Sequence, residues 1–269
     1  MKRNTARWFS FAFIALLLSA AFGAVAHGQA PTHKPNKPNI WEARRNLALL
    51  NVEPVDEHYR FSAESFEFEP KPINPKKARE EVRIDLLTAP VVKATCNNSG
   101  CRITDETGKP FPKDTNLGKL FQTGWCGTSP TEVCLDGVNR YINAFNRLRT
   151  YARDTDSPLR TFTQRAAAWR ALATKPPIPE EVRVQRLLAE NAIKENNPGE
   201  ALNHYENGIE LYPTWPEGNF NAALISGDLG YYDTAMEHMQ AYLELVPEAA
   251  DAQAARDKIL IWQDKTKEK

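Results

Sequence analysis

The sequence has no excess of either charge. Lysine and arginine together number 34, and so do aspartate and glutamate, in a chain of 269 residues. Residues 1–30 hold three basic residues and no acid, so the rest of the chain carries 31 basic residues against 34 acidic ones, a net charge close to −3. Nucleic-acid binding requires a concentrated basic surface that neutralises phosphates. The charge balance therefore excludes a nucleic-acid-binding protein.

Residues and motifs that carry common chemistries are also few. The chain contains no H-E-x-x-H metal motif, no G-x-S-x-G nucleophile motif and no glycine-rich phosphate loop. It has five histidines, of which His204 and His238 stand 34 residues apart at equivalent places of the repeat described below. The repeat accounts for this pair without a metal. We therefore expect no enzyme activity, no metal and no cofactor.

Four cysteines fall in one stretch of the chain, at Cys96, Cys101, Cys126 and Cys134. In an exported chain, an even number of cysteines confined to one region predicts two disulfides. Three pairings are open, of which the most local joins the first two cysteines and the last two. The spacings C-x4-C and C-x7-C are not the tight knuckles of a structural zinc site. A zinc site, or a reactive thiol with His58 as its base, is the alternative.

Residues 1–30 have the pattern of a secretory signal peptide. Basic residues precede an apolar run from Trp8 to Ala24, and small residues follow at 24–26 and at 28–30. Either place offers the small-x-small pattern that signal peptidase cleaves. We expect cleavage near Ala26 or Ala30 and a periplasmic or secreted protein, with association with the cell envelope as part of this hypothesis. An uncleaved membrane anchor is the alternative.

Residues 31–54 are interpreted as a linker followed by a short helix. The segment 31–39 is rich in proline and asparagine, which predicts an extended chain that does not pack. The segment 41–50 has an amphipathic pattern, and its leucines at 47, 49 and 50 need a partner surface.

Residues 55–152 are predicted to form a small α+β domain. Aromatic residues alternate from Tyr59 to Glu69, which predicts two short strands, and further strands are expected at 82–87 and between 91 and 103. A turn is expected at 105–108, where Gly108 allows a positive φ. A helix over 136–152, with Asp136 as its N-cap, then closes the domain. Its apolar face consists of Val138, Tyr141, Ile142, Phe145 and Leu148.

Residues 153–179 are predicted to connect this domain to the rest of the chain. A helix is expected over 157–172, and the proline-rich stretch 175–179 acts as a rigid hinge.

Residues 180–269 contain one unit of 34 residues written twice. Ala201 and Ala235 stand 34 apart, and so do Pro213 and Pro247. A small alanine lets two helices approach closely, and a proline ends the second helix of each pair. The pattern predicts helices near 180–195, 198–212, 216–229 and 232–246. A closing helix over 249–263 is expected to pack through Ala252, Ala255, Ile259 and either Ile261 or Trp262.

This unit resembles the tetratricopeptide repeat, a family whose members bind proteins or peptides. The resemblance covers about the last third of the chain, and it implies antiparallel helix pairs whose first helices line a concave groove. A repeat needs neighbours on both sides, so the helix over 157–172 is expected to cover the first repeat and the closing helix the last. The fold class is thus α+β: a small disulfide-stapled, strand-rich domain closed by a helix, followed by an all-α array of tetratricopeptide hairpins.

The family template places the second, fifth, ninth and twelfth residues of each first helix toward the groove. With the sixth place of the second repeat added, these residues are Arg183, Arg186, Glu190, Ile193, Glu217, Phe220, Asn221, Leu224 and Gly227. Family members that hold a peptide carboxylate use a cation at the fifth place and asparagine at the ninth. Glu190 stands where that asparagine is needed and would repel a carboxylate. An apolar anchor against Phe220 and Leu224 is therefore expected instead.

The sequence as a whole predicts an exported protein, not an enzyme, that binds a protein or peptide partner through a short tetratricopeptide groove. A small-ligand or lipid-binding envelope domain at 55–152, with the repeats as a coupling module, is the alternative. Other hypotheses are a repeat pair that acts as a rigid spacer or dimer contact, and an enzyme that uses the cysteine-rich region. Trp215, in the turn between the repeats, is expected to be buried.

Overall fold

The N-terminal half of the chain contains two small antiparallel sheets. The computed structural model describes residues 37–49, 60–68, 81–97, 100–121 and 132–267, and residues from Lys37 onward form one compact unit. The first sheet has the order β1 (Arg60–Phe61), β2 (Ser65–Phe68) and β3 (Val82–Asp85). Phe66 pairs with Phe61 on one side and with Ile84 on the other. These strands confirm the alternation seen in the sequence.

The second sheet is a hairpin of β4 (Val92–Asn97) and β5 (Gly100–Asp105). Cys96 lies directly opposite Cys101 in this ladder, and the two form a disulfide. The predicted turn follows β5: Gly108 has a φ of 86°, and the Asp105 carboxylate accepts hydrogen bonds from the main-chain N–H groups of Thr107 and Lys109. A short helix, α2 (Asn116–Leu120), comes next and is capped by Thr115.

The helix α3 (Glu132–Arg153) packs against β4 and closes the strand region, as the sequence predicts. Its five predicted core residues are all buried. The predicted N-cap is wrong, because the helix begins one turn earlier and Asp136 lies inside it, paired with Arg140 at 3.1 Å. The exposed Val133 and the half-buried Cys134 extend the helix without contributing to its apolar face.

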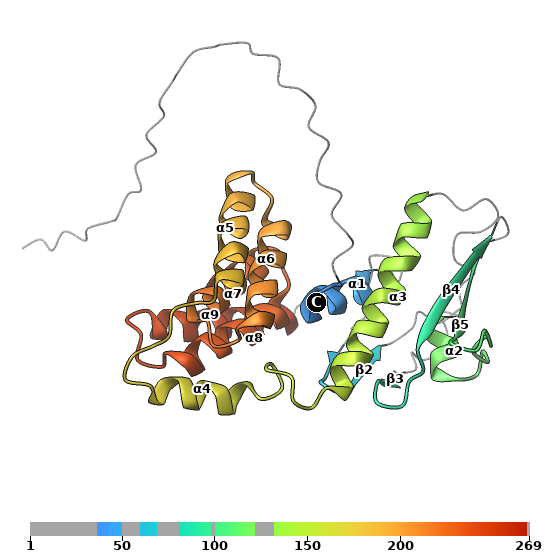
Figure 1. Ribbon diagram of the computed structural model, residues 1–269, viewed down its shortest axis with the longest axis horizontal. Coiled ribbons are helices and arrows are strands. Elements are labelled where there is room, and N and C mark those ends of the chain that lie inside the picture. Colours follow the sequence, from blue (N-terminus) through green and yellow to red (C-terminus); the bar gives the residue numbers. More distant parts are fainter. Residues whose placement is uncertain (1–36, 50–59, 69–80, 98–99, 122–131, 268–269) are drawn as a thin grey trace, which may run out of the picture. The chain divides into compact units, whose positions relative to one another are not determined.

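The helix α1 (Ile40–Leu49) packs against α3, and Figure 1 shows the two side by side. Its buried residues include Ile40, Ala43 and Leu47. The sequence predicted that residue 39 belongs to an unpacked linker, but Asn39 is 1% exposed. It caps α1 by accepting a hydrogen bond from the main-chain N–H of Glu42, and it donates to Asn207 Oδ1 at 3.1 Å.

The predicted connecting helix is shorter than expected and lies in a different place. Turns occupy 155–161, and α4 covers Phe162–Ala171. The sequence placed this helix over the first repeat, but it packs against α8. The chain from 172 to 179 is extended or bent, and it carries the backbone from α4 to the next helix.

The C-terminal half consists of helical hairpins with the predicted boundaries. The first pairs α5 (Glu180–Lys194) with α6 (Pro198–Leu211), and the second pairs α7 (Pro216–Asp228) with α8 (Tyr232–Leu245). Pro198 and Pro216 occupy first-turn positions, where a missing N–H costs nothing. The last helix, α9 (Ala252–Lys267), packs on α8 through Ile259 and Trp262, whereas Ile261 is exposed.

Residues 34 apart in the two hairpins are buried alike. Ala189 and Ala223 are fully buried, and so are Ala201 and Ala235. Trp215 is 2% exposed at the seam between the hairpins, as predicted. A Cβ on Gly218 would come within 2.1 Å of its ring, and one on Gly208 within 2.7 Å. The hairpins therefore pack closely because small residues surround one large aromatic ring.

The chain is thus α+β, with two small antiparallel sheets and a mostly helical remainder. One cluster of buried apolar residues runs from α1, the sheets and α3 into α5, α6 and α7. A second cluster joins α7, α8 and α9. In the described part of the chain, no helix is both long and apolar enough to cross a membrane. The predicted signal peptide, His58 and Cys126 lie outside the described residues.

Candidate functional site

The residues predicted to bind a partner lie on the first helices of the two hairpins. We call the set the α5/α7 surface; it consists of Arg183, Arg186, Glu190, Ile193, Glu217, Phe220, Asn221 and Leu224. None of these side chains belongs to the fully buried core, and Arg183, Ile193 and Glu217 are exposed.

Arg186 joins the two helices of this surface electrostatically. Its guanidinium lies 3.7 Å from Glu190 on its own helix and 3.7 Å from Glu217 on α7. One cation is thus bracketed by two carboxylates, and the three side chains together carry a net charge of −1. Burial is the first cause of the raised pKa of Tyr205, and the charges of Glu190 and Glu217 raise it further. The centre of the surface is therefore electronegative.

Asn221 and the predicted apolar anchor residues, Phe220 and Leu224, are half-buried and already contact other residues of the chain. Asn221 donates a hydrogen bond to the hydroxyl of Tyr205 at 3.3 Å. The ring of Phe220 lies 4.9 Å from that of Tyr242, and Leu224 packs against the same C-terminal apolar cluster. Gly227, the twelfth place of the template, is not open to a partner, because the ring of Trp262 lies where a Cβ would be. The helix α9 therefore bounds the α5/α7 surface at this end.

The outer side of α5 also exposes apolar residues. Val184, Leu187 and Leu188 are each exposed by 43–46%. The sequence placed the connecting helix over this side, but α4 packs on α8 instead. As a result, these apolar side chains of α5 remain exposed.

The opposite face of the hairpins, formed by α6 and α8, is occupied by the chain's own α1. The Arg45 guanidinium donates to both carboxylate oxygens of Glu206, at 2.5 and 2.6 Å, and to Asn203 at 2.8 Å. On α8, the ring of His238 packs against that of Trp41, with centroids 4.6 Å apart and the two planes tilted by 44°. Sequence reasoning missed these contacts, because the two sides are more than 150 residues apart.

Glu206 is fully buried, yet the ion pair keeps it charged. Burial alone raises the pKa of a carboxyl group, but here the charge and the hydrogen bonds of Arg45 outweigh it, and the pKa of Glu206 is lowered. His238 Nε2 lies 3.7 Å from the same carboxylate. The pKa of Glu42, on α1, is shifted in the opposite direction, because burial raises it.

The two equivalent histidines have different surroundings. His204 is half-buried and its Nδ1 lies 2.9 Å from Gln185 Oε1, whereas His238 is 1% exposed under Trp41. Among the described residues, no group of three histidine, cysteine or acidic side chains could hold a metal ion.

The described cysteines are all bonded. Cys96 and Cys101 form one disulfide, as in the most local of the three pairings left open above, and Cys134 is also disulfide-bonded. None of these three can act as a thiolate ligand or nucleophile. Cys126 and His58 lie outside the described residues. The structure therefore does not test a Cys126–Cys134 disulfide or a thiol at Cys126 with His58 as its base.

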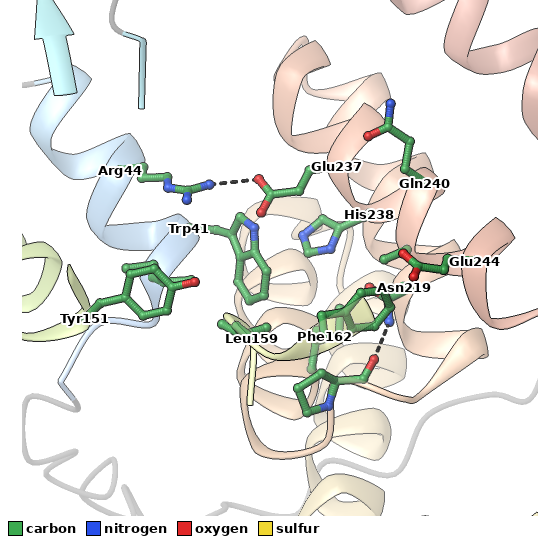
Figure 2. Close-up of a pocket in the computed structure, with 14 residues that line it drawn as sticks. Trp41, Arg44, Tyr151, Leu159, Phe162, Asn219, Glu237, His238, Gln240 and Glu244 are labelled. Atoms are coloured by element: carbon green, nitrogen blue, oxygen red, sulfur yellow. Dashed lines mark hydrogen bonds and ion pairs between the residues drawn. The ribbon is translucent and has the colours of Figure 1, made fainter. Parts of the chain in front are cut away.

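A cavity of about 220 Å³ lies where α1, the end of α3, the start of α4 and the hairpins meet. Figure 2 shows Trp41, Tyr151 and Phe162 among its walls, with Glu237, His238 and Glu244 contributed by α8. Sequence reasoning missed this cavity as well. Of the predicted ligand-binding region 55–152, only Tyr151 lines it. No local sequence signal marks it, because four separate segments form its walls.

Comparison with protein families and with curated proteins found no match to this chain.

Proposed function

We propose that the chain is an exported protein, not an enzyme, that binds a partner protein through the α5/α7 surface, in the manner of a tetratricopeptide-repeat module. The observation that carries this proposal is the electronegative centre of that surface, where Arg186 lies between Glu190 and Glu217 and the half-buried Phe220 and Leu224 lie on the same helix as Glu217. An apolar patch beside a charged rim is the usual composition of a peptide-binding site.

The regularity of the hairpins supports the relation to tetratricopeptide repeats. Both hairpins place a fully buried alanine at each of two equivalent positions, 34 residues apart. Prolines occupy the first turn of α6 and of α7, and a buried tryptophan fills the seam between the hairpins. This regular stacking holds the first helices of neighbouring hairpins next to each other, which is how repeat proteins build an extended binding face.

The charges indicate which partner fits. A peptide carboxylate that approached Arg186 would also meet Glu190 and Glu217, so it is disfavoured. A segment with one large apolar side chain and a nearby lysine or arginine fits better, since its cation would face Glu190 and Glu217. The exposed Ile193 adds apolar area at the edge of the surface.

A displayed peptide library selected against the purified chain tests this proposal. We expect the selected peptides to share an apolar anchor flanked by lysine or arginine. Charge reversal with Glu190→Lys and Glu217→Lys should shift the selected peptides toward acidic residues, because the sign of the local potential is inverted. Binding of one selected peptide should weaken about tenfold or more in the double variant, which calorimetry can measure.

Arg256→Glu is a matched control, since it reverses a charge on the exposed side of α9, away from the α5/α7 surface. It should leave both the selected motif and the affinity unchanged. If the double variant selects the same peptides as the parent chain, or if no motif emerges from either, the proposed function is wrong.

A further inference from the structure

The cavity beneath α1 has an apolar body and polar ends. Trp41, Leu159 and Phe162 supply aromatic and aliphatic walls, and Figure 2 places Tyr151 on one side of the view and Glu244 with Asn219 on the other. Glu237, Ala241 and Glu244 line it from α8, at spacings that put them on one face of the helix. A molecule bound here would contact residues of α1, α4 and α8.

Asn219 contributes an acceptor, Oδ1, that has no donor among the described residues. The residue is 1% exposed, and its Nδ2 donates to the main-chain oxygens of Pro213 and Trp215, both at 3.0 Å. Because both partners are acceptors, the orientation of the amide is fixed and Oδ1 points away from them. No described residue donates to that oxygen. A donor from a ligand would satisfy it.

Tyr151 contributes a second group without a partner. Its side chain is nine-tenths buried, and its hydroxyl, which points toward the cavity in Figure 2, has no hydrogen-bond partner among the described residues. Burial is the main cause of its raised pKa, so the phenol keeps its proton and can either donate or accept.

The charged side chains that line the cavity include one arginine and two glutamates. Arg44 and Glu237 neutralise each other, with Nη1 and Oε2 2.8 Å apart. The carboxylate of Glu244 has no ion pair among the described residues, since the nearby Arg170 donates to its main-chain oxygen instead. Of the two carboxylates that line the cavity, Glu244 is therefore the one without an ion pair among the described residues.

We propose that this cavity binds a small organic ammonium compound with an apolar or aromatic body. The ammonium group lies against Glu244 and Asn219 Oδ1, the body packs on Trp41 and Phe162, and an oxygen at the other end meets the hydroxyl of Tyr151. Aromatic faces and a carboxylate together recognise organic cations through cation–π and ionic contacts. This site is separate from the α5/α7 surface and does not depend on the function proposed for it.

Three small probes of nearly equal size test the assignment by calorimetry on the whole chain. Tyramine carries both polar ends, phenethylamine lacks the phenolic oxygen, and 4-ethylphenol lacks the ammonium group. We expect tyramine to bind about tenfold more tightly than either of the other two, since each lost contact involves a buried or charged hydrogen bond.

Two variants assign the ends of the ligand. Glu244→Gln should weaken tyramine and phenethylamine but not 4-ethylphenol. Tyr151→Phe should weaken tyramine and 4-ethylphenol but not phenethylamine, and it keeps the ring that packs in the wall. Glu248→Gln, an exposed substitution near the end of α8 that does not line the cavity, is the matched control and should change none of the affinities.

Three outcomes of these measurements would contradict the proposal. If 4-ethylphenol binds as tightly as tyramine, the cavity selects an apolar body alone and the cation assignment is wrong. If none of the three probes binds at millimolar concentration, the cavity holds water only and the proposal is overturned. If Glu244→Gln and Glu248→Gln weaken tyramine equally, the effect is general electrostatics and not a contact in the cavity.

Discussion

The two faces of the helical hairpins differ in what covers them. The α6/α8 face is occupied by α1, which buries the Arg45–Glu206 ion pair and packs Trp41 against His238. The α5/α7 face is bounded by α9 at one end, and its ion pairs are partly solvated. The same repeat thus presents one face to the chain itself and leaves the other available to a partner. We infer that intramolecular binding and partner binding are divided between the two faces.

Of the substitutions that test this comparison, removal of Arg45 should have the largest effect on the stability of the folded chain. Arg45→Ala leaves the carboxylate of Glu206 buried without its partner, and loss of one member of a buried pair costs about 3–5 kcal/mol. Chemical denaturation should therefore show a marked fall in the free energy of unfolding. Arg183→Ala, which removes the exposed pair with Glu180 on the other face, should leave it nearly unchanged. Equal effects of the two substitutions would contradict the comparison.

A substitution at the seam between the hairpins should have the next largest effect on stability, because both faces depend on how the hairpins pack there. Gly218→Ala places a methyl group within 2.1 Å of the ring of buried Trp215, and such overpacking costs about 1–3 kcal/mol. Gly199→Ala is the matched control, because nothing lies within 4 Å of its Cβ position and alanine favours helix. Thermal unfolding should show a lower midpoint for the first variant and an equal or higher one for the second. A neutral Gly218→Ala would mean that the hairpins are not packed through this ring.

The dependence of stability on pH gives the smallest effect. The pKa of Glu206 lies below its ordinary value of 4.5 in the folded chain, so its contribution is complete above that pH and is lost as the pH falls through the lowered pKa. Glu42, whose pKa is raised, acts in the opposite direction. The difference between the chain and Glu206→Gln, measured by denaturation from pH 7 to pH 3, isolates the contribution of Glu206. That difference should narrow in acid, and two parallel profiles would contradict a buried, charged Glu206.

Local patterns predicted most of the elements. The 34-residue period placed α5 to α8 within one or two residues, because small residues and prolines at fixed offsets dictate where paired helices approach and end. Alternating aromatics predicted β1 and β2, and the cysteine spacing offered the Cys96–Cys101 disulfide as its most local pairing. Each of these signals is complete within a few residues or within one repeat.

The candidate sites were predictable to different degrees. The α5/α7 surface follows from helical periodicity, so its residues could be listed from the sequence, except that Trp262 covers Gly227. The residues of the cavity could not be listed in this way, because α1 is more than 100 residues away from the other segments that form its walls, and no sequence pattern indicates that Trp41 and Glu244 line one cavity. The position of α4 was wrong for the same reason: periodicity defines an apolar face but not the surface that it contacts.

His204 and His238 show where the sequence stops and the tertiary structure begins. By itself, the sequence assigns them one role, since they occupy the same place in two copies of one unit. In the folded chain, His204 contacts Gln185 of the neighbouring helix, whereas His238 is buried under Trp41. The repeat determines the backbone and the direction of both side chains, because these depend on helical geometry. Only the docking of α1, a contact between distant segments, decides which of the two is removed from water.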